Sequence, residues 1–517
     1  MSRQRLSTPW ICDSTARIEA TAPNRRKFLG LTSLWVAGSL ASAPGGLHAA
    51  ETPHRTADRE ADRSEITAPV SLSVNHDQQR FRVRMEIDVE GNVNIPANPL
   101  VSRTKARAIP LQSEAVFDYE ERYRLPHDAS PDSYVTAAER FYHEAESVND
   151  LNDTKRHAQL RRDVAHAIVR RDTLPEIIYS TTDSFTSNEL ELLRTPVSSL
   201  AVDDLLPVDA VLGGDQYLID AEVMRGLLNL SSVERCEVKA EVVAISDADA
   251  RIQIRGDLDG SVEGVPTKIR VVGKLTFDRT AGITSWLALA VHETRDIGIA
   301  VPGFDVAATI KMVRQPLTQG VAMPAEPFPL DVTAAIDPAA LLIELKSQQV
   351  GISTRMDRRW RMISDVRGLS MMRMIENDRS IAQCDFRRLS QLEEGKQWSM
   401  EALQANIRTT LGEQLLQLEL ANERVNAAGL RVLSVVARGS VQEVPIHWII
   451  QHFSDDSGRR AMATFTMEAD LLDAFDSSDV QLSETLRFID PPGAEAATEI
   501  ATRSRIVTGR QDDRPTP

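Results

Sequence analysis

A short run of polar residues, His292-Glu293-Thr294-Arg295-Asp296, interrupts an otherwise apolar predicted strand. Because side chains alternate between the two faces of a strand, Glu293 and Arg295 share one face. One explanation is an ion-pair ladder between this strand and its neighbour. The other is contact with the polar head of a ligand. Glu293 and Arg295 are therefore the candidate ligand-contact residues of this sequence.

Covalent catalysis would need a serine or cysteine held on a sharp turn beside a base. The sequence has no Gly-x-Ser-x-Gly pattern and neither of the glycine-rich patterns that cradle phosphate. Cys236 and Cys384 fall in the middle of predicted strands, where a thiol usually packs as a small apolar group. A disulfide between these two cysteines is the alternative. The sequence predicts no catalytic residue and no cofactor.

Metal ligands are equally hard to find in the sequence. The patterns CxxC, HxH and HExxH are absent. His447 and His452 lie five positions apart in one predicted strand, so they face opposite sides and cannot form a two-histidine site. A group of methionines could bind a soft metal, but its members occupy both faces of their strands, which favours core packing. These are Met356, Met362, Met371, Met372 and Met374. No metal site is predicted.

The N-terminal segment contains Asn24-Arg25-Arg26-Lys27-Phe28-Leu29-Gly30, followed by a weakly apolar stretch to Ala43. That stretch is shorter than the roughly 20 residues a membrane-spanning helix needs. The run resembles the twin-arginine export signal, with Arg25, Arg26, Phe28 and Leu29 matching and the two flanking residues departing from it. Small residues ending at Ala50 form a suitable peptidase site. The resemblance implies export to the periplasm or the exterior. An uncleaved signal anchored in the inner membrane is the alternative.

Charge limits the partners of the chain. Its 517 residues carry a formal net charge of −16, and residues 1–50 hold an excess of basic residues, so the remainder is still more acidic. Such a surface repels phosphate backbones, and no nucleic-acid partner is expected. It also disfavours attachment to anionic lipid, so membrane contact is expected only through an uncleaved signal segment.

Residues 51–70 are charged and lack apolar periodicity, which predicts a flexible spacer. Residues 71–316 read mainly as strands. Apolar residues alternate with charged ones from Phe81 to Val89, the pattern of a half-buried strand, and Glu90-Gly91-Asn92 is predicted to close it with a turn. A helix is predicted to start at Thr186. A second short helix is predicted at 220–229. Five consecutive strands of an antiparallel meander are predicted at 234–246, 251–260, 264–278, 282–295 and 305–315.

The meander includes Gly256-x-Leu258-x-Gly260, then Gly264 and the run Gly273–Asp278. This order resembles the LolA/LppX-like family of exported half-barrels. The resemblance implies a curved antiparallel sheet that cups apolar material. A long sheet of this kind must also twist and curl, and it commonly wraps around a helix.

Residues 317–356 are rich in proline and alanine and are predicted to be a linker. Residues 357–490 mix strands and helices. Ser399 is predicted to cap a helix whose apolar face carries Leu403, Ile407, Leu411, Leu415 and Leu418. Further strands are predicted at 359–363, 368–373, 381–386, 430–438, 444–454, 459–468 and 485–488, with a helix around 469–475. Residues 491–517 are predicted to be a disordered tail.

The second half contains Ile446-His447-Trp448, the turn Gly458-Arg459-Arg460, the run Phe465–Glu468 and a closing Leu486-Arg487-Phe488. These features resemble the PsbP-like α/β/α sandwich family, whose members mostly serve binding and assembly. The fold class expected for the whole chain is α+β. It places a long antiparallel curved sheet first and a smaller α/β/α sandwich domain second.

The sequence as a whole predicts an exported, non-enzymatic binding or assembly protein of the bacterial cell envelope. Its first domain would shelter an apolar ligand, and its second would bind an envelope protein. Two alternatives stay open at this point: an envelope hydrolase using Asp or Glu residues that no motif identifies, and a purely structural envelope component.

Overall fold

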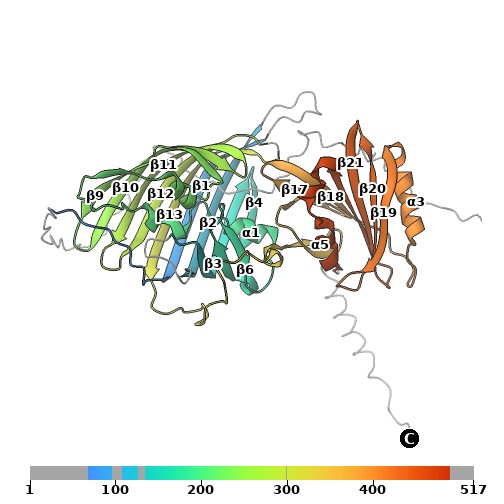
Figure 1. Cartoon of the computed structure of the whole chain (residues 1–517), viewed down its shortest axis with the longest axis horizontal. Coiled ribbons are helices and arrows are strands. Elements are labelled where there is room, and N and C mark those ends of the chain that lie inside the picture. The colour runs from blue at the N-terminus through green and yellow to red at the C-terminus, as the bar shows by residue number, and fades with distance from the viewer. Residues whose placement is uncertain (1–67, 96–106, 126–133, 299, 490–517) are drawn as a thin grey trace, which may run out of the picture.

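The computed structural model describes residues 68–95, 107–125, 134–298 and 300–489. The export motif at Arg25, Arg26, Phe28 and Leu29, almost all of the predicted spacer and the predicted tail lie outside the described residues. The described chain is mostly β. It forms a 13-stranded sheet, a seven-stranded sheet and a small three-stranded sheet between them (Figure 1).

The large sheet is antiparallel throughout and has the order β6-β5-β3-β2-β1-β13-β12-β11-β10-β9-β7, with β4 paired to β3 and β8 to β10. The predicted antiparallel meander is confirmed as β9 to β13. Its first predicted strand, 234–246, is broken into two strands, β8 and β9. The strands are β1 Arg80–Ile95, β2 Arg107–Tyr123, β3 Ala137–Leu151, β4 Thr154–Gln159, β5 His166–Arg170, β6 Ile177–Ser180, β7 Gln216–Leu218, β8 Ser232–Cys236, β9 Lys239–Ile245, β10 Asp249–Val262, β11 Val265–Asp278, β12 Ile283–Arg295 and β13 Gly303–Pro316.

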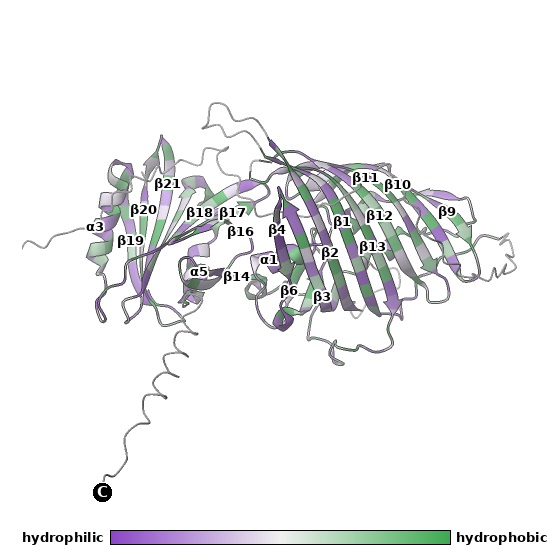
Figure 2. Cartoon of the chain, turned by 180° about the vertical axis from the view of Figure 1, so that it is seen from behind, coloured by the Kyte–Doolittle hydropathy of each residue, from purple (hydrophilic) through white to green (hydrophobic). Residues whose placement is uncertain are grey.

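Alternation of polar and apolar residues sets the two faces of this sheet, as the bands across the strands in Figure 2 show. In β1 the apolar residues from Phe81 to Val89 are buried, as predicted. The turn predicted at Glu90-Gly91-Asn92 is wrong, because β1 continues to Ile95. A Cβ on Gly91 would lie 2.2 Å from the carbonyl oxygen of Asp305. Glycine at this position therefore lets β13 approach closely and does not mark a turn.

A helical segment between β6 and β8 covers much of the inner face of the large sheet. It contains α1 Ser187–Leu193, the short 3-10 helices η2 Ser199–Ala201 and η3 Asp203–Leu205, and α2 Ala221–Leu227. Another 3-10 turn, η1 Arg162–Val164, precedes β5. The predicted start of α1 is confirmed, since Thr186 and Glu189 form a capping box. Leu190, Leu200 and Met224 pack into the core that the sheet provides.

The range 317–356, predicted as a linker, contains the 3-10 turn η4 Pro338–Leu341 and two strands. These are β14 Ile343–Ser347 and β15 Ile352–Met356, which pair with each other and with β23 Arg487–Phe488. Each is only five residues long, too short for its alternation to stand out beside the prolines that precede it.

The second sheet has the order β16-β17-β18-β22-β21-β20-β19 and is also antiparallel. Helix α3 packs on one face through Leu403 and Ile407, while α4 and α5 contribute Phe475 and Leu482 to the core on the other. The elements are β16 Trp360–Val366, β17 Leu369–Glu376, β18 Arg379–Arg388, α3 Met400–Leu411, η5 Gly412–Gln414, β19 Leu415–Val425, β20 Arg431–Val441, β21 Val444–Ser454, β22 Arg460–Glu468, η6 Ala469–Leu471, α4 Leu472–Phe475 and α5 Ser478–Thr485.

Two details of this half correct the sequence prediction. Ser399 does cap α3, accepting a hydrogen bond from the Ala402 N–H. However, α3 ends at Leu411, and Leu415 and Leu418 belong to strand β19. The closing strand β23 joins the three-stranded sheet rather than the seven-stranded one, and α5 was not predicted at all.

One hydrophobic cluster joins the inner face of the large sheet to the second sheet. It includes Ile87 and Leu287 on one side and Trp360 and Phe465 on the other. No helix in the described part of the chain combines the length and the apolar character that crossing a membrane requires.

Candidate functional site

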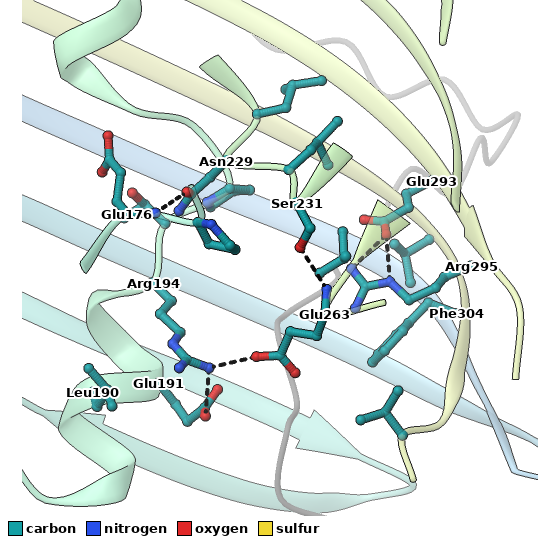
Figure 3. A pocket seen from close by; sticks show the side chains of 18 of the residues that line it. Glu176, Leu190, Glu191, Arg194, Asn229, Ser231, Glu263, Glu293, Arg295 and Phe304 are labelled. Carbon is teal, nitrogen blue, oxygen red and sulfur yellow. Dashed lines mark hydrogen bonds and ion pairs between the residues drawn. The ribbon is translucent and has the colours of Figure 1, made fainter. Parts of the chain in front are cut away.

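A cavity of about 450 Å³ lies where the inner face of the large sheet meets β16 and β17. Figure 3 shows some of the side chains that line it. Its floor comes from the large sheet, and one wall comes from α1 and the segments beside it. The tips of two hairpins and the start of β16 complete it. The sequence elements that build it are therefore far apart in the chain.

The floor of the cavity is apolar because strand alternation and register align inward-facing residues. Val291 of β12 lies opposite Ala308 of β13, which in turn lies opposite Val89 of β1. Val306 and Phe304 continue the floor toward its rim. These side chains form rows across the sheet, so the floor is a continuous apolar surface.

Glu293 and Arg295 follow Val291 on the inward face of β12, and both line the cavity. The expected ion-pair ladder between strands is wrong, because the two residues pair with each other along one strand. Arg295 Nη2 lies 2.6 Å from Glu293 Oε1, and its guanidinium lies 5.0 Å from the centre of the Phe304 ring. Thr267 donates a hydrogen bond to Glu293 Oε1 at 2.9 Å. Contact of this pair with a ligand stays a prediction.

A collar of further arginine–carboxylate pairs surrounds the floor. Arg194, just after α1, lies 3.4 Å from Glu191 and 3.1 Å from Glu263. Arg361 of β16 lies 3.8 Å from each of the same two carboxylates. Ser231 accepts a hydrogen bond from the Glu263 N–H at 3.1 Å, as Figure 3 shows. The collar is therefore held in place by shared ion pairs.

Turn chemistry brings the two hairpin tips together. Glu263 and Gly264 have φ values of 50° and 84°, as a two-residue hairpin turn with both residues left-handed requires. In the β17–β18 turn, Asn377 and Asp378 have φ values of 45° and 59°. A Cβ on Gly264 would lie 3.0 Å from the backbone of Asn377, so the tips touch. Asp378 Oδ1 also accepts the Ala300 N–H at 2.7 Å.

Among the lining residues, Glu176 and Arg358 have pKa values that burial shifts toward the neutral form. Burial raises the pKa of Glu176, although Arg140, a hydrogen bond from Ser198 and Arg171 oppose the shift. Burial lowers the pKa of Arg358 to about 10, and the positive charges of Arg194 and Arg361 add to that effect while Asp357 opposes it. Arg358 is still cationic at neutral pH. Glu176 is held in the wall by partners on the large-sheet side, including Asn229, which accepts its backbone N–H at 2.5 Å.

The other candidate residues of the sequence lie away from the cavity. Cys236 and Cys384 are both free thiols. His447 accepts a hydrogen bond from Arg438 Nε at 3.3 Å, whereas His452 stacks on Trp398 with ring centres 5.0 Å apart. Burial lowers the pKa of His452 to about 4. Among the residues that the structure describes, no three His, Cys, Asp or Glu side chains gather to hold a metal ion.

Sequence reasoning missed most of the collar and the neighbouring Arg358. Glu191, Arg194, Glu263, Arg358 and Arg361 belong to no shared motif and come from three separate stretches of chain. The one local signal was the short gap between the predicted strands 251–260 and 264–278, which places Glu263 at a hairpin tip. Nothing in the sequence indicated which element that tip would contact.

No family model matches the chain, and no curated protein matches it. Solved structures give only distant likenesses. The translocator domain of autotransporter NalP from Neisseria meningitidis shares 6% identity over 75% of this chain and 86% of that one, with a TM-score of 0.11. The outer membrane protein OmpT of Vibrio cholerae shares 7% identity over 75% of this chain and 98% of that one, with a TM-score of 0.10. Pseudomonas aeruginosa OccK1 shares 9% identity over 75% and 96% of the two chains, with a TM-score of 0.11. Scores this low do not indicate a shared fold.

Proposed function

We propose that this protein is an exported, non-enzymatic binding protein of the bacterial cell envelope, and that its cavity shelters an apolar ligand. The observation that carries the proposal is a cavity of about 450 Å³ with an apolar floor and a charged collar. Small-molecule sites commonly occupy about 300–1,000 Å³ and combine apolar walls with a few polar groups. The resemblance of the sequence of residues 71–316 to LolA/LppX-like half-barrels, which stays a prediction, implies the same function.

The second half is proposed to act as a PsbP-like module that binds an envelope protein. Helices on both faces of its seven-stranded sheet support this assignment, with α3 on one face and α4 and α5 on the other. The large sheet contributes the cavity floor and the second half contributes part of its collar. A partner that binds to the second half would therefore bind to the part of the protein that also contributes to the collar around the ligand.

Binding accounts for the lining residues better than hydrolysis does. Acid–base hydrolysis uses two carboxylates that face the substrate and are free to exchange protons. Glu191, Glu263 and Glu293 are each paired with arginine, as is Glu376. Asp378 accepts backbone N–H groups. These partners hold the carboxylates as structural parts of the collar.

Filling the cavity is expected to abolish uptake of an apolar probe. Ala308 lies on the floor, so Ala308→Phe places a ring where the ligand would lie. We expect it to weaken binding of the neutral dye N-phenyl-1-naphthylamine by about tenfold or more, since pocket shape discriminates on this scale. The dye becomes fluorescent in apolar surroundings, so a fluorescence titration gives the affinity. Lipid extraction and mass spectrometry of protein from its own host would identify the natural occupant.

Ala307→Phe is the matched control, because Ala307 is the preceding residue of β13 and faces outward. Its dye affinity should equal that of the unchanged protein. No dye uptake by the unchanged protein, or equal uptake by the Ala308→Phe variant, would remove the basis of the proposal.

Export is proposed to depend on Arg25 and Arg26. The double substitution Arg25→Lys and Arg26→Lys keeps the charge but removes the guanidinium pair, so the precursor should accumulate in the cytoplasm. Cell fractionation followed by immunoblotting measures this. The changes Arg3→Lys and Arg5→Lys lie outside the motif and should leave export intact. An unchanged distribution of the Arg25/Arg26 variant would contradict the assignment to the envelope.

A further inference from the structure

Arg358 differs from every other arginine that lines the cavity. Arg194, Arg295, Arg359 and Arg361 each have a carboxylate within ion-pair distance. For Arg358, the described residues offer no carboxylate at that distance. The nearby Asp357 instead lies 2.9 Å from Arg359.

The position of the Arg358 side chain is set by backbone carbonyls. Its Nε donates to the carbonyl oxygen of Leu341 at 3.0 Å, and its Nη1 donates to that of Ile178 at 3.2 Å. Nη2 has no partner among the described residues. The guanidinium is therefore anchored on one side and has three N–H groups left to offer, one on Nη1 and two on Nη2. An anchored fork of this kind matches the oxygens of a carboxylate or phosphate.

An unpaired cation in this setting is costly. Burial and the neighbouring charges of Arg194 and Arg361 disfavour the charged form of Arg358, which explains the direction of its pKa. An anion beside the guanidinium would relieve both effects. The remaining carboxylates of the wall do not supply that anion, since Glu176 and Asp378 have partners of their own.

We infer that the cavity binds an amphipathic anion, whose apolar chain lies on the floor and whose carboxylate or phosphate group is held by Arg358. This inference rests on the proposed binding function and adds the chemical class of the ligand. The apolar row of Val89, Ala308 and Val291 and the unpaired guanidinium line the same cavity. A chain ending in an anionic group satisfies both at once. A neutral apolar ligand would leave the cation unpaired.

The test compares three probes with the same chain: palmitate, hexadecyl phosphate and hexadecanol. Each displaces the neutral dye from the full-length mature protein. We expect at least one anionic probe to bind about tenfold tighter than hexadecanol, as a charge-assisted hydrogen-bonded pair implies. Whichever anion binds more tightly identifies the headgroup as carboxylate or phosphate. Inorganic phosphate should compete with the dye far more weakly than hexadecyl phosphate, because it has no apolar chain to pack against the floor.

Arg358→Gln should remove the preference for the anionic probes while leaving hexadecanol binding unchanged, which also shows that the variant is folded. Arg358→Lys should keep part of the preference, because it keeps the charge and loses the fork. Arg270→Gln removes one positive charge from the exposed outer face of β11 and should have no effect.

The outcomes separate the two proposals. If hexadecanol binds as tightly as the anions, or if Arg358→Gln retains the preference, the inference about the anion fails and the binding function stands. If neither the dye nor any probe binds, both the inference about the anion and the proposed binding function fail. Equal competition by inorganic phosphate and hexadecyl phosphate would overturn the role of the apolar floor.

Discussion

Replacing Arg314 with methionine is expected to lower the free energy of unfolding by about 3–5 kcal/mol, the usual cost of breaking a buried ion pair from one side. Arg314 lies on β13 and is only 1% exposed. Its Nη1 lies 2.9 Å from Asp203 of η3 and donates to the Thr284 carbonyl at 3.2 Å. Its Nη2 donates to the Tyr123 hydroxyl. Methionine would fill much of the space but leave Asp203 without its cation.

The reason for so large an effect is that Arg314 joins the helical segment to the sheet. Burial lowers the pKa of Arg314, but Asp203 and Tyr123 more than reverse this, so the net pKa is raised and the charge is firmly held. The guanidinium also lies 4.5 Å from the centre of the Phe81 ring. Chemical denaturation measures the change in stability.

The control for this prediction is Arg270→Met. Arg270 of β11 also pairs with an aspartate, Asp257, at 2.9 Å, but its side chain is 70% exposed. Exposed pairs contribute little, so this variant should unfold nearly as the unchanged protein does. The double variant Arg314→Met with Asp203→Asn should recover part of the lost free energy of unfolding, because it removes the unpaired charge of Asp203. Equal stability of the Arg314 and Arg270 variants would contradict the prediction.

Acid is expected to release the segment 317–330, which we call the strap. Two buried glutamates hold it against the large sheet: Glu120 lies near the end of β2 and Glu139 near the start of β3. Glu120 accepts the N–H groups of Val321 and Ala322 at 2.9 Å each and that of Met323 at 3.2 Å. Glu139 accepts the Phe328 N–H at 3.3 Å. Carboxylate oxygens that must stay ionised therefore accept four backbone N–H groups of the strap, while Arg122 and Arg124 donate to its carbonyl oxygens.

The sign of the pH dependence follows from the pKa shifts. Burial tends to raise the pKa of both glutamates, but hydrogen bonds outweigh it and lower both values. For Glu120 these come from Ala322, His143, Met323 and Val321; for Glu139 from His166 and Phe328, with the charge of Arg122 adding to them. A lowered pKa in the folded state means that the stabilisation is complete above the ordinary carboxyl pKa of 4.5. It is lost as the pH falls through the lowered values.

Glu139→Gln is expected to cost about 1.5–3 kcal/mol at neutral pH, the range for hydrogen bonds to a charged group, and to flatten the acid dependence. Unfolding at a series of pH values measures both, and limited proteolysis reports release of the strap. Glu114→Gln is the control, since Glu114 lies exposed on β2. Identical pH profiles for the Glu139 variant and the unchanged protein would rule out this role for the carboxylate.

Local sequence alone determined most of the strands and the helix starts. The strands from β10 to β13 follow from period-two alternation, and α1 and α3 follow from Thr186 and Ser399, which cap them. These signals are local because a strand's two faces and a helix's first N–H groups are satisfied by residues close in the chain. The position of Glu293 and Arg295 on one face followed in the same way.

Tertiary structure alone decided which distant residues meet. Gly91 was predicted to mark a turn. In the structure it lies within β1, where the absence of a side chain lets β13 approach closely. Leu415 and Leu418 continued the spacing of α3, yet they pair with β20 as strand β19. The strap, the partner of β23 and the meeting of Arg358 with the apolar floor depend on contacts between residues far apart in the chain. Such contacts are chosen by packing across the whole molecule, and the residues themselves carry no local sign of them.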